Sequence, residues 1–162
     1  MTRWHLRTAV AVSLGLVAAG CGGDDADSSV CSAPVREALD QQSLVHVLAD
    51  DQVEYLTDPP TSGPHAPGAS AVGVLDTPLP RPTQVGVLEA GGILLQHNGL
   101  DPAAQADLES LAADGVVVAP NPDAPDPVTA TAWLHKQVCE TTDTATLIAF
   151  IEDHRNQGPG SD

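Results

Sequence analysis

Histidine and carboxylate side chains are the residues of this chain best suited to chemistry. His65 lies in a segment rich in proline and glycine (58–69, DPPTSGPHAPGA), whose constrained backbone would hold an imidazole in a defined position. Imidazole and carboxylate groups together suit zinc or copper(II). His46, His65, Glu89 and His97 are therefore the candidate ligands of a metal site, with copper or zinc as the candidate cofactor. The alternative is that His65 only hydrogen-bonds its loop to the neighbouring sheet.

Motifs of the common enzyme classes are missing. The chain has no glycine-rich nucleotide loop, no Gly-x-Ser-x-Gly elbow and no His-Glu-x-x-His pair. Ser62 stands three residues before His65, but no orienting acid or oxyanion donor accompanies it. We assign no catalytic residue and expect a non-enzymatic protein. A hydrolase or a metal-dependent catalyst is the alternative.

The first 21 residues have the layout of a bacterial secretory signal. Arg3 and Arg7 precede an apolar run of about 11 residues, too short to span a bilayer of roughly 30 Å. The ending Ala-Ala-Gly-Cys resembles a lipobox, which predicts lipidation of Cys21 and an extracytoplasmic protein anchored to the cell membrane. Residues 1–20 would be the signal peptide, 21–30 a flexible acidic tether, and 31–162 a single globular domain. An ordinary cleaved signal and an uncleaved anchor are the alternatives.

Charge and aromatic content exclude a nucleic acid partner. The chain has 22 acidic and 6 basic residues, and loss of Arg3 and Arg7 with the signal leaves a net charge of −18. Such a surface repels phosphates. Only Tyr55, Trp133 and Phe150 are aromatic beyond the signal, which is too few for base stacking.

Two cysteines remain once Cys21 is assigned to lipid. Cys31 and Cys139 form an even pair in an oxidising compartment, which predicts one disulfide. A pair of reactive or metal-binding thiols is the alternative, although no Cys-x-x-Cys spacing is present.

The elements that must position these residues alternate loosely between helix and strand, without a repeating βαβ unit. We expect an α+β fold, a single domain with a mixed β-sheet packed against helices. A first helix is expected at 35–41. A second helix is expected to begin at Pro102, with Asp101 as N-cap, and Gly115 closes its segment. A third helix is expected at 144–156, with Leu147, Ile148 and Ile151 facing inward. Strands are expected at 44–48, 116–118 and 128–134, and a strand or hairpin at 84–97.

Several segments resemble one known family. They are Tyr55–His65 (YLTDPPTSGPH), Thr131–Trp133 followed by Cys139, Phe150–Ile151 and Gly158–Pro159. Together they resemble domain-of-unknown-function family 3105, from about His46 to Pro159. The resemblance implies an extracytoplasmic or membrane-anchored bacterial protein, and it implies no established activity.

One departure from that family bears on the metal site. The family usually shows a Val-His-x-Leu-Glu-His-Gly-Gly segment, and here Gly86 and Ala90 stand at its two histidine positions. His46 and His65 match the family's other histidines. The resemblance therefore implies a reduced histidine site, which would bind metal more weakly, use His97 as a substitute ligand, or no longer bind metal. From residues and resemblance together we expect a lipid-anchored cell-envelope protein, a binding or interaction module, with metal binding as the alternative.

Overall fold

The computed structural model describes Met1, residues 29–68 and residues 71–161. All helices and strands of this part lie between Val35 and His154. The expected signal peptide beyond Met1, the lipidated Cys21 and most of the expected tether lie outside the described residues. Among the residues described, no helix is long and apolar enough to cross a membrane.

A six-stranded mixed sheet forms the centre of the fold. In spatial order its strands are β1 (Val35–Arg36), β6 (His135–Cys139), β5 (Val128–Ala132), β3 (Ile93–His97), β4 (Val116–Pro120) and β2 (Gly73–Val74). The pairs from β1 to β3 are antiparallel, and β4 pairs in parallel with both β3 and β2.

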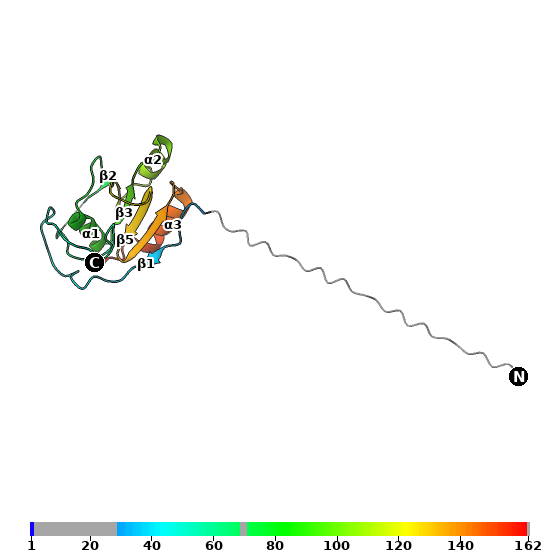
Figure 1. Ribbon diagram of the computed structural model, residues 1–162, viewed down its shortest axis with the longest axis horizontal. Coiled ribbons are helices and arrows are strands. Elements are labelled where there is room, and N and C mark those ends of the chain that lie inside the picture. The colour runs from blue at the N-terminus through cyan, green and yellow to red at the C-terminus, as the bar shows by residue number, and fades with distance from the viewer. Residues whose placement is uncertain (2–28, 69–70, 162) are drawn as a thin grey trace.

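Three helices cover the two faces of this sheet, with α1 (Arg81–Glu89) on one side and α3 (Thr144–His154) on the other (Figure 1). Because side chains alternate along a strand, β3 contributes Ile93 and Leu95 to one core and Leu94 to the other. The larger core also holds residues of α3 and Leu108 of α2 (Pro102–Glu109), whereas the smaller one holds residues of α1. The predicted α+β fold with a mixed sheet is confirmed.

The register of the sheet places four strand termini at one end. His97 pairs with Pro120 and with Val128, and Val128 pairs with Cys139. Cys139 is bonded to Cys31, with an S–S distance of 2.06 Å, so the predicted disulfide is confirmed. We call this the disulfide end. At the opposite end of the sheet lie Ile93, the β5–β6 turn and the start of β6.

The predicted helix over residues 35–41 is wrong. Val35 and Arg36 form the edge strand β1, and the chain then continues without regular structure. The amide of Ser32 donates to Val138 and the amide of Glu37 donates to Leu134, so both flanks of the strand are bound to β6. Tertiary pairing thus outweighs the local signal for a helix, in which Pro34 would stand at the helix start.

The predicted strand or hairpin at 84–97 is helical in its first half. The prolines at 80 and 82 lie at the start of α1, where a missing amide proton costs nothing. Gly91 takes φ 85° in the turn that follows, and the strand begins only at Ile93. Glu89 and His97 therefore belong to different elements and do not share a strand face.

Other predicted boundaries differ less. The segment at 44–48 forms a single bridge through His46, and β5 ends before Trp133. Asp101 caps α2 as predicted, accepting hydrogen bonds from the amides of Ala103 and Ala104, but the helix ends at Glu109. In α3, Leu147 and Ile151 are buried as predicted, whereas Ile148 is 44% exposed.

Candidate functional site

The proline-rich loop (residues 58–68) is buried over its central part, from Pro59 to His65. The Leu134 amide donates to the Thr61 carbonyl at 3.1 Å, and the Asp40 amide donates to the Ser62 hydroxyl at 3.0 Å. The Tyr55 hydroxyl donates to the Pro64 carbonyl at 2.8 Å. Burial raises the pKa of Tyr55 to about 12, which keeps this donor protonated. The central part of the loop is thus held at Thr61, Ser62 and Pro64.

Gly63 shows why this loop needs a glycine. Its φ of 130° disfavours other residues, and a Cβ there would lie 2.9 Å from the Tyr55 ring. The Tyr55 ring therefore packs directly on the backbone two residues before His65.

Glu37 fixes the start of the loop from the neighbouring segment. Its carboxylate accepts from Thr57 at 2.7 Å and from Thr61 at 2.6 Å, and its other oxygen lies 3.0 Å from the Lys136 ammonium. Burial by itself raises the pKa of Glu37, but the Thr61, Thr57 and Lys136 hydrogen bonds outweigh it and hold the pKa below its ordinary value. The carboxylate is therefore charged at neutral pH, and it ties the loop to β6.

His65 and His46 lie side by side because their backbones are paired. The His65 amide donates to the Val45 carbonyl at 3.1 Å, and the Val47 amide donates to the His65 carbonyl at 3.0 Å. This parallel bridge places the ring centroids 5.0 Å apart, edge to face. His65 is only 3% exposed, whereas His46 is exposed.

These two rings line a cavity of about 680 Å³ at the end of the sheet opposite the disulfide. Its walls come from the segment after β1, the proline-rich loop, the end of α1, the β5–β6 turn and the C-terminus. The lining residues are Leu39, Asp40, Gln41, Ser43, Leu44, His46, His65, Glu89, Trp133 and Pro159. Most of the lining surface is apolar, with a few polar groups, as is common for ligand sites.

Glu89 is held at the cavity by the C-terminal tail (residues 156–161). The Gly160 amide donates to the Glu89 carbonyl at 2.9 Å, and the Asn156 amide donates to the Gly91 carbonyl at 2.8 Å. A Cβ on Gly160 would lie 2.8 Å from the Glu89 carboxylate, so that carboxylate rests on the tail. The tail thereby satisfies carbonyls at the end of α1 and places Pro159 in the cavity wall.

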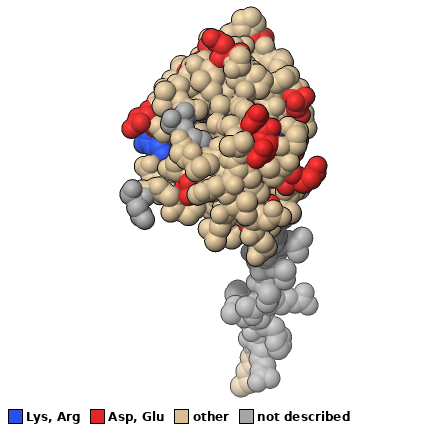
Figure 2. All heavy atoms as spheres, turned by 90° about the vertical axis from the view of Figure 1, so that its left-hand side faces the viewer, with Lys and Arg blue, Asp and Glu red and all other residues tan. Residues whose placement is uncertain are grey.

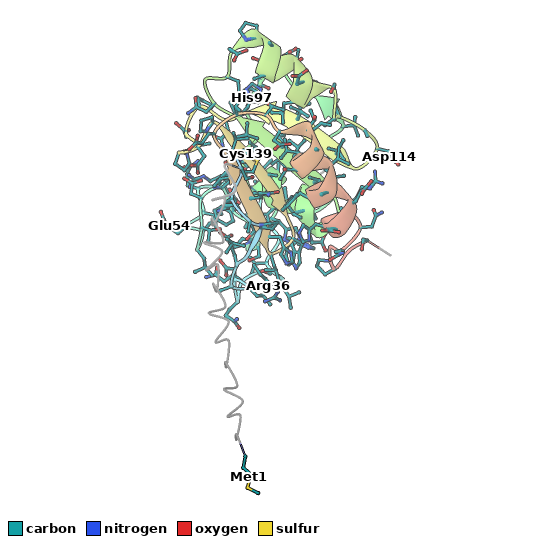
Figure 3. All side chains as sticks on the ribbon, turned by 90° about the vertical axis from the view of Figure 1, so that its right-hand side faces the viewer. Met1, Arg36, Glu54, His97, Asp114 and Cys139 are labelled. Atoms are coloured by element: carbon teal, nitrogen blue, oxygen red, sulfur yellow. A yellow bond between two sulfur atoms is a disulfide. The ribbon has the colours of Figure 1, made fainter. Side chains whose placement is uncertain are left out.

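His97 is separated from the other predicted ligands. It closes β3 at the disulfide end, whereas Glu89 precedes the opposite end of the same strand. Figure 3 shows His97 and Arg36 toward opposite ends of the domain, and Arg36 pairs with His135 beside the cavity end. His97 lines a different cavity, together with Asp76 and Asn98. The predicted substitution of His97 for a missing ligand is therefore not supported by its position.

The structure brings together three of the four predicted site residues, namely His46, His65 and Glu89. Within the part of the chain that is described, no group of three or more His, Cys, Asp or Glu side chains is arranged to hold a metal ion. The three residues thus share a cavity without converging on one point.

Comparison with known proteins identifies the family but no activity. Residues 46–162 match the family described as Protein of unknown function (DUF3105). The chain belongs to this family. Neither the curated proteins nor the solved structures gave a match. The resemblance seen in the sequence is thus confirmed, and the DUF3105 match includes the proline-rich loop, Trp133 and the C-terminal tail.

The two positions at which this DUF3105 protein departs from the usual family segment lie outside the cavity lining. Gly86 is buried within α1, and Ala90 is the exposed residue that follows the helix. The two histidines that line the cavity, His46 and His65, are those that match the family pattern.

Sequence reasoning missed five cavity residues that matter chemically, namely Leu39, Asp40, Leu44, Trp133 and Pro159. Trp133 and Pro159 each stand in a segment that carries the family resemblance, which is a signal that could have indicated them. Asp40 and the two leucines lie in a stretch without regular structure, and their sequence carries no comparable signal.

Proposed function

We propose that this chain is a cell-envelope lipoprotein whose domain binds a small, largely apolar ligand without catalysing a reaction on it. The observation that carries this proposal is the cavity lined by Trp133, two leucines, His46, His65 and Glu89. Its volume of about 680 Å³ lies within the range of small-molecule sites.

The hydrogen bonds at the cavity favour binding over catalysis. Nδ1 of His65 lies 3.2 Å from the Gly63 carbonyl, so that nitrogen is already engaged. Among the described residues, no serine, threonine or cysteine side chain is hydrogen-bonded to an imidazole, which a histidine-activated nucleophile would require. The Ser62 hydroxyl instead accepts from the Asp40 amide.

Binding is tested with N-phenyl-1-naphthylamine, a neutral dye that fluoresces in apolar sites. The chain from Gly22 contains every described helix and strand and has Trp133 as its only tryptophan. We expect saturable dye fluorescence with energy transfer from Trp133. Leu39→Asp, which places a charge in the lining, should weaken dye binding, whereas Leu48→Asp, at a residue that is 70% exposed and outside the lining, should not. Equal loss in both variants, or no saturable binding, would contradict the proposal.

The membrane anchor rests on the sequence of residues 1–21. We expect the full chain, expressed in a bacterium, to incorporate labelled palmitate, and Cys21→Ser to abolish the incorporation. Release of an unlabelled wild-type protein into the medium would instead support an ordinary cleaved signal.

Transition-metal binding is the second candidate, favoured by the neighbouring imidazoles of His46 and His65. Two imidazoles can supply half of a four-ligand zinc or copper(II) shell, with water for the rest. We expect copper(II) titration to show one equivalent bound, lost in His46→Ala and retained in His97→Ala. His46 is exposed, so its replacement does not disturb a core. Equal loss in the two variants would argue against this site.

A further inference from the structure

The charged side chains that line the cavity are acidic. Two of its lining residues, Asp40 and Glu89, are carboxylates, and none of the four basic residues in the described part of the chain lines it. Figure 2, which looks onto the α1 side of the molecule, shows acidic side chains spread over the surface and basic atoms in one place only. A net charge of −16 for the whole chain adds a field of the same sign.

Three of those four basic side chains are engaged elsewhere. Arg81 pairs with Asp58 at 2.7 Å, and Lys136 pairs with Glu37 at 3.0 Å. Arg155 donates to the Asp114 carbonyl. The two ion pairs within the described residues involve neither Asp40 nor Glu89.

Asp40 is buried, and its carboxylate is only partly engaged. The residue is 8% exposed, and one of its carboxylate oxygens accepts from the Gln42 amide at 2.8 Å. Its other oxygen accepts no hydrogen bond from the described residues and is not among the buried polar atoms without a partner, so it is accessible to solvent or to a ligand. A ligand that brings donors and positive charge would satisfy it.

His65 adds a third acceptor to the cavity. The Gly63 carbonyl can only accept a hydrogen bond, so Nδ1 of His65 carries the proton in that contact. In the neutral ring Nε2 is then an acceptor, and it has no partner among the described residues. Asp40, Glu89 and Nε2 of His65 can all accept hydrogen bonds, so the cavity favours a ligand that carries a hydrogen-bond donor.

Trp133 and the leucines indicate which other groups the ligand should carry. An indole face attracts a cation, and Leu39, Leu44 and Pro159 offer apolar surface beside it. We propose that the cavity binds a small organic cation, an amine with an apolar body, whose ammonium group lies near Asp40 and Glu89. This inference rests on the proposed binding function and specifies its ligand class.

The test compares three probes of one shape and different charge. They are phenethylamine, phenethyl alcohol and 3-phenylpropanoate, each titrated against Trp133 fluorescence and against bound N-phenyl-1-naphthylamine. We expect the amine to bind about tenfold tighter than the alcohol, because charge-assisted hydrogen bonds are roughly twice as strong as neutral ones, and the anion to bind weakest. Glu89→Gln should remove most of the amine's advantage, whereas Glu152→Gln, on the exposed face of α3, should leave it unchanged.

Two failures are distinguishable. If the dye binds but the alcohol equals or exceeds the amine, the cation preference is wrong and the binding function stands. If the dye does not bind at all, the proposed function itself is wrong, and the cation inference falls with it.

Discussion

Glu37 shows how a single carboxylate organises the proline-rich loop. It receives two threonine hydroxyls of that region and the Lys136 ammonium of β6. Hydrogen bonds to a charged group are worth about 1.5–3 kcal/mol each when the partner would otherwise stay buried. The loop that carries His65 is therefore joined to the sheet through one charged residue.

This arrangement predicts an acid-sensitive stability. The folded-state pKa of Glu37 lies below its ordinary value of 4.5. The contribution of Glu37 to the free energy of unfolding is therefore fully present above about pH 4.5, and it is lost as the pH falls through the folded-state pKa. Glu37→Gln should lower the free energy of unfolding by about 2 kcal/mol near pH 7. The variant and the wild type should converge as the pH falls below 4.5 and through the folded-state pKa of Glu37.

Urea denaturation across this pH range measures the effect. Glu54→Gln, at an exposed glutamate, is the matched control and should follow the wild type at every pH. A difference between Glu37→Gln and the wild type that stays constant throughout the acid range below pH 4.5 would contradict the assigned role.

At the scale of elements, the C-terminal tail completes helix α1. A Cβ on Gly158 would lie 2.2 Å from the Glu89 carbonyl oxygen and 2.4 Å from the Gly91 nitrogen. Both atoms are backbone, which cannot rotate aside. The tail can therefore pack on the helix end only because residue 158 is a glycine.

Gly158→Ala should displace the tail and with it the Pro159 wall of the cavity. We expect a loss of about 1–3 kcal/mol in stability, as for overpacked sites, and weaker dye binding. Gly99→Ala is the control. Its φ of 69° strains alanine, but apart from its chain neighbours no atom of the described residues lies within 4 Å of the added Cβ. It should lose about 1–2 kcal/mol and keep dye binding. Normal dye binding by Gly158→Ala would show that the tail does not shape the cavity.

At the scale of the whole molecule, the sheet separates two ends with different roles. The disulfide joins Cys31 to Cys139 at one end, and the Glu140 amide donates to Val30 there, where the described chain begins. The cavity lies at the other end, beyond the β5–β6 turn. The cavity and the disulfide therefore lie at opposite ends of the sheet.

Removing the disulfide should lower stability without closing the cavity. The two cysteines are 108 positions apart. In the chain-entropy model, a disulfide that closes a loop of this length stabilises the folded state by about 4–5 kcal/mol. The double variant Cys31→Ser, Cys139→Ser should unfold at lower urea and still bind the dye under native conditions. A folded variant that binds no dye would show that the two ends are coupled.

Features that depend on local chemistry or on composition could be predicted from the amino-acid sequence. Asp101 and Pro102 predict the start of α2 because a cap and a preset φ act within one turn. The apolar run Val116–Val118 predicts β4, and the parity of Cys31 and Cys139 predicts the disulfide. The YLTDPPTSGPH segment identified the family, and His46 and His65 followed from residue type.

Tertiary structure decided which of these residues meet. Residues 35–41 became an edge strand because β6 offered hydrogen bonds that a lone helix turn could not match. Residues 81–89 form a helix because the sheet offers an apolar face against which Val87 and Leu88 pack. This packing outweighs the strand-like apolar pattern of the segment. His97 was predicted in the site but does not line the cavity, whereas Asp40, Trp133 and Pro159 do. Contacts between distant segments depend on sheet order and register, which no local pattern encodes.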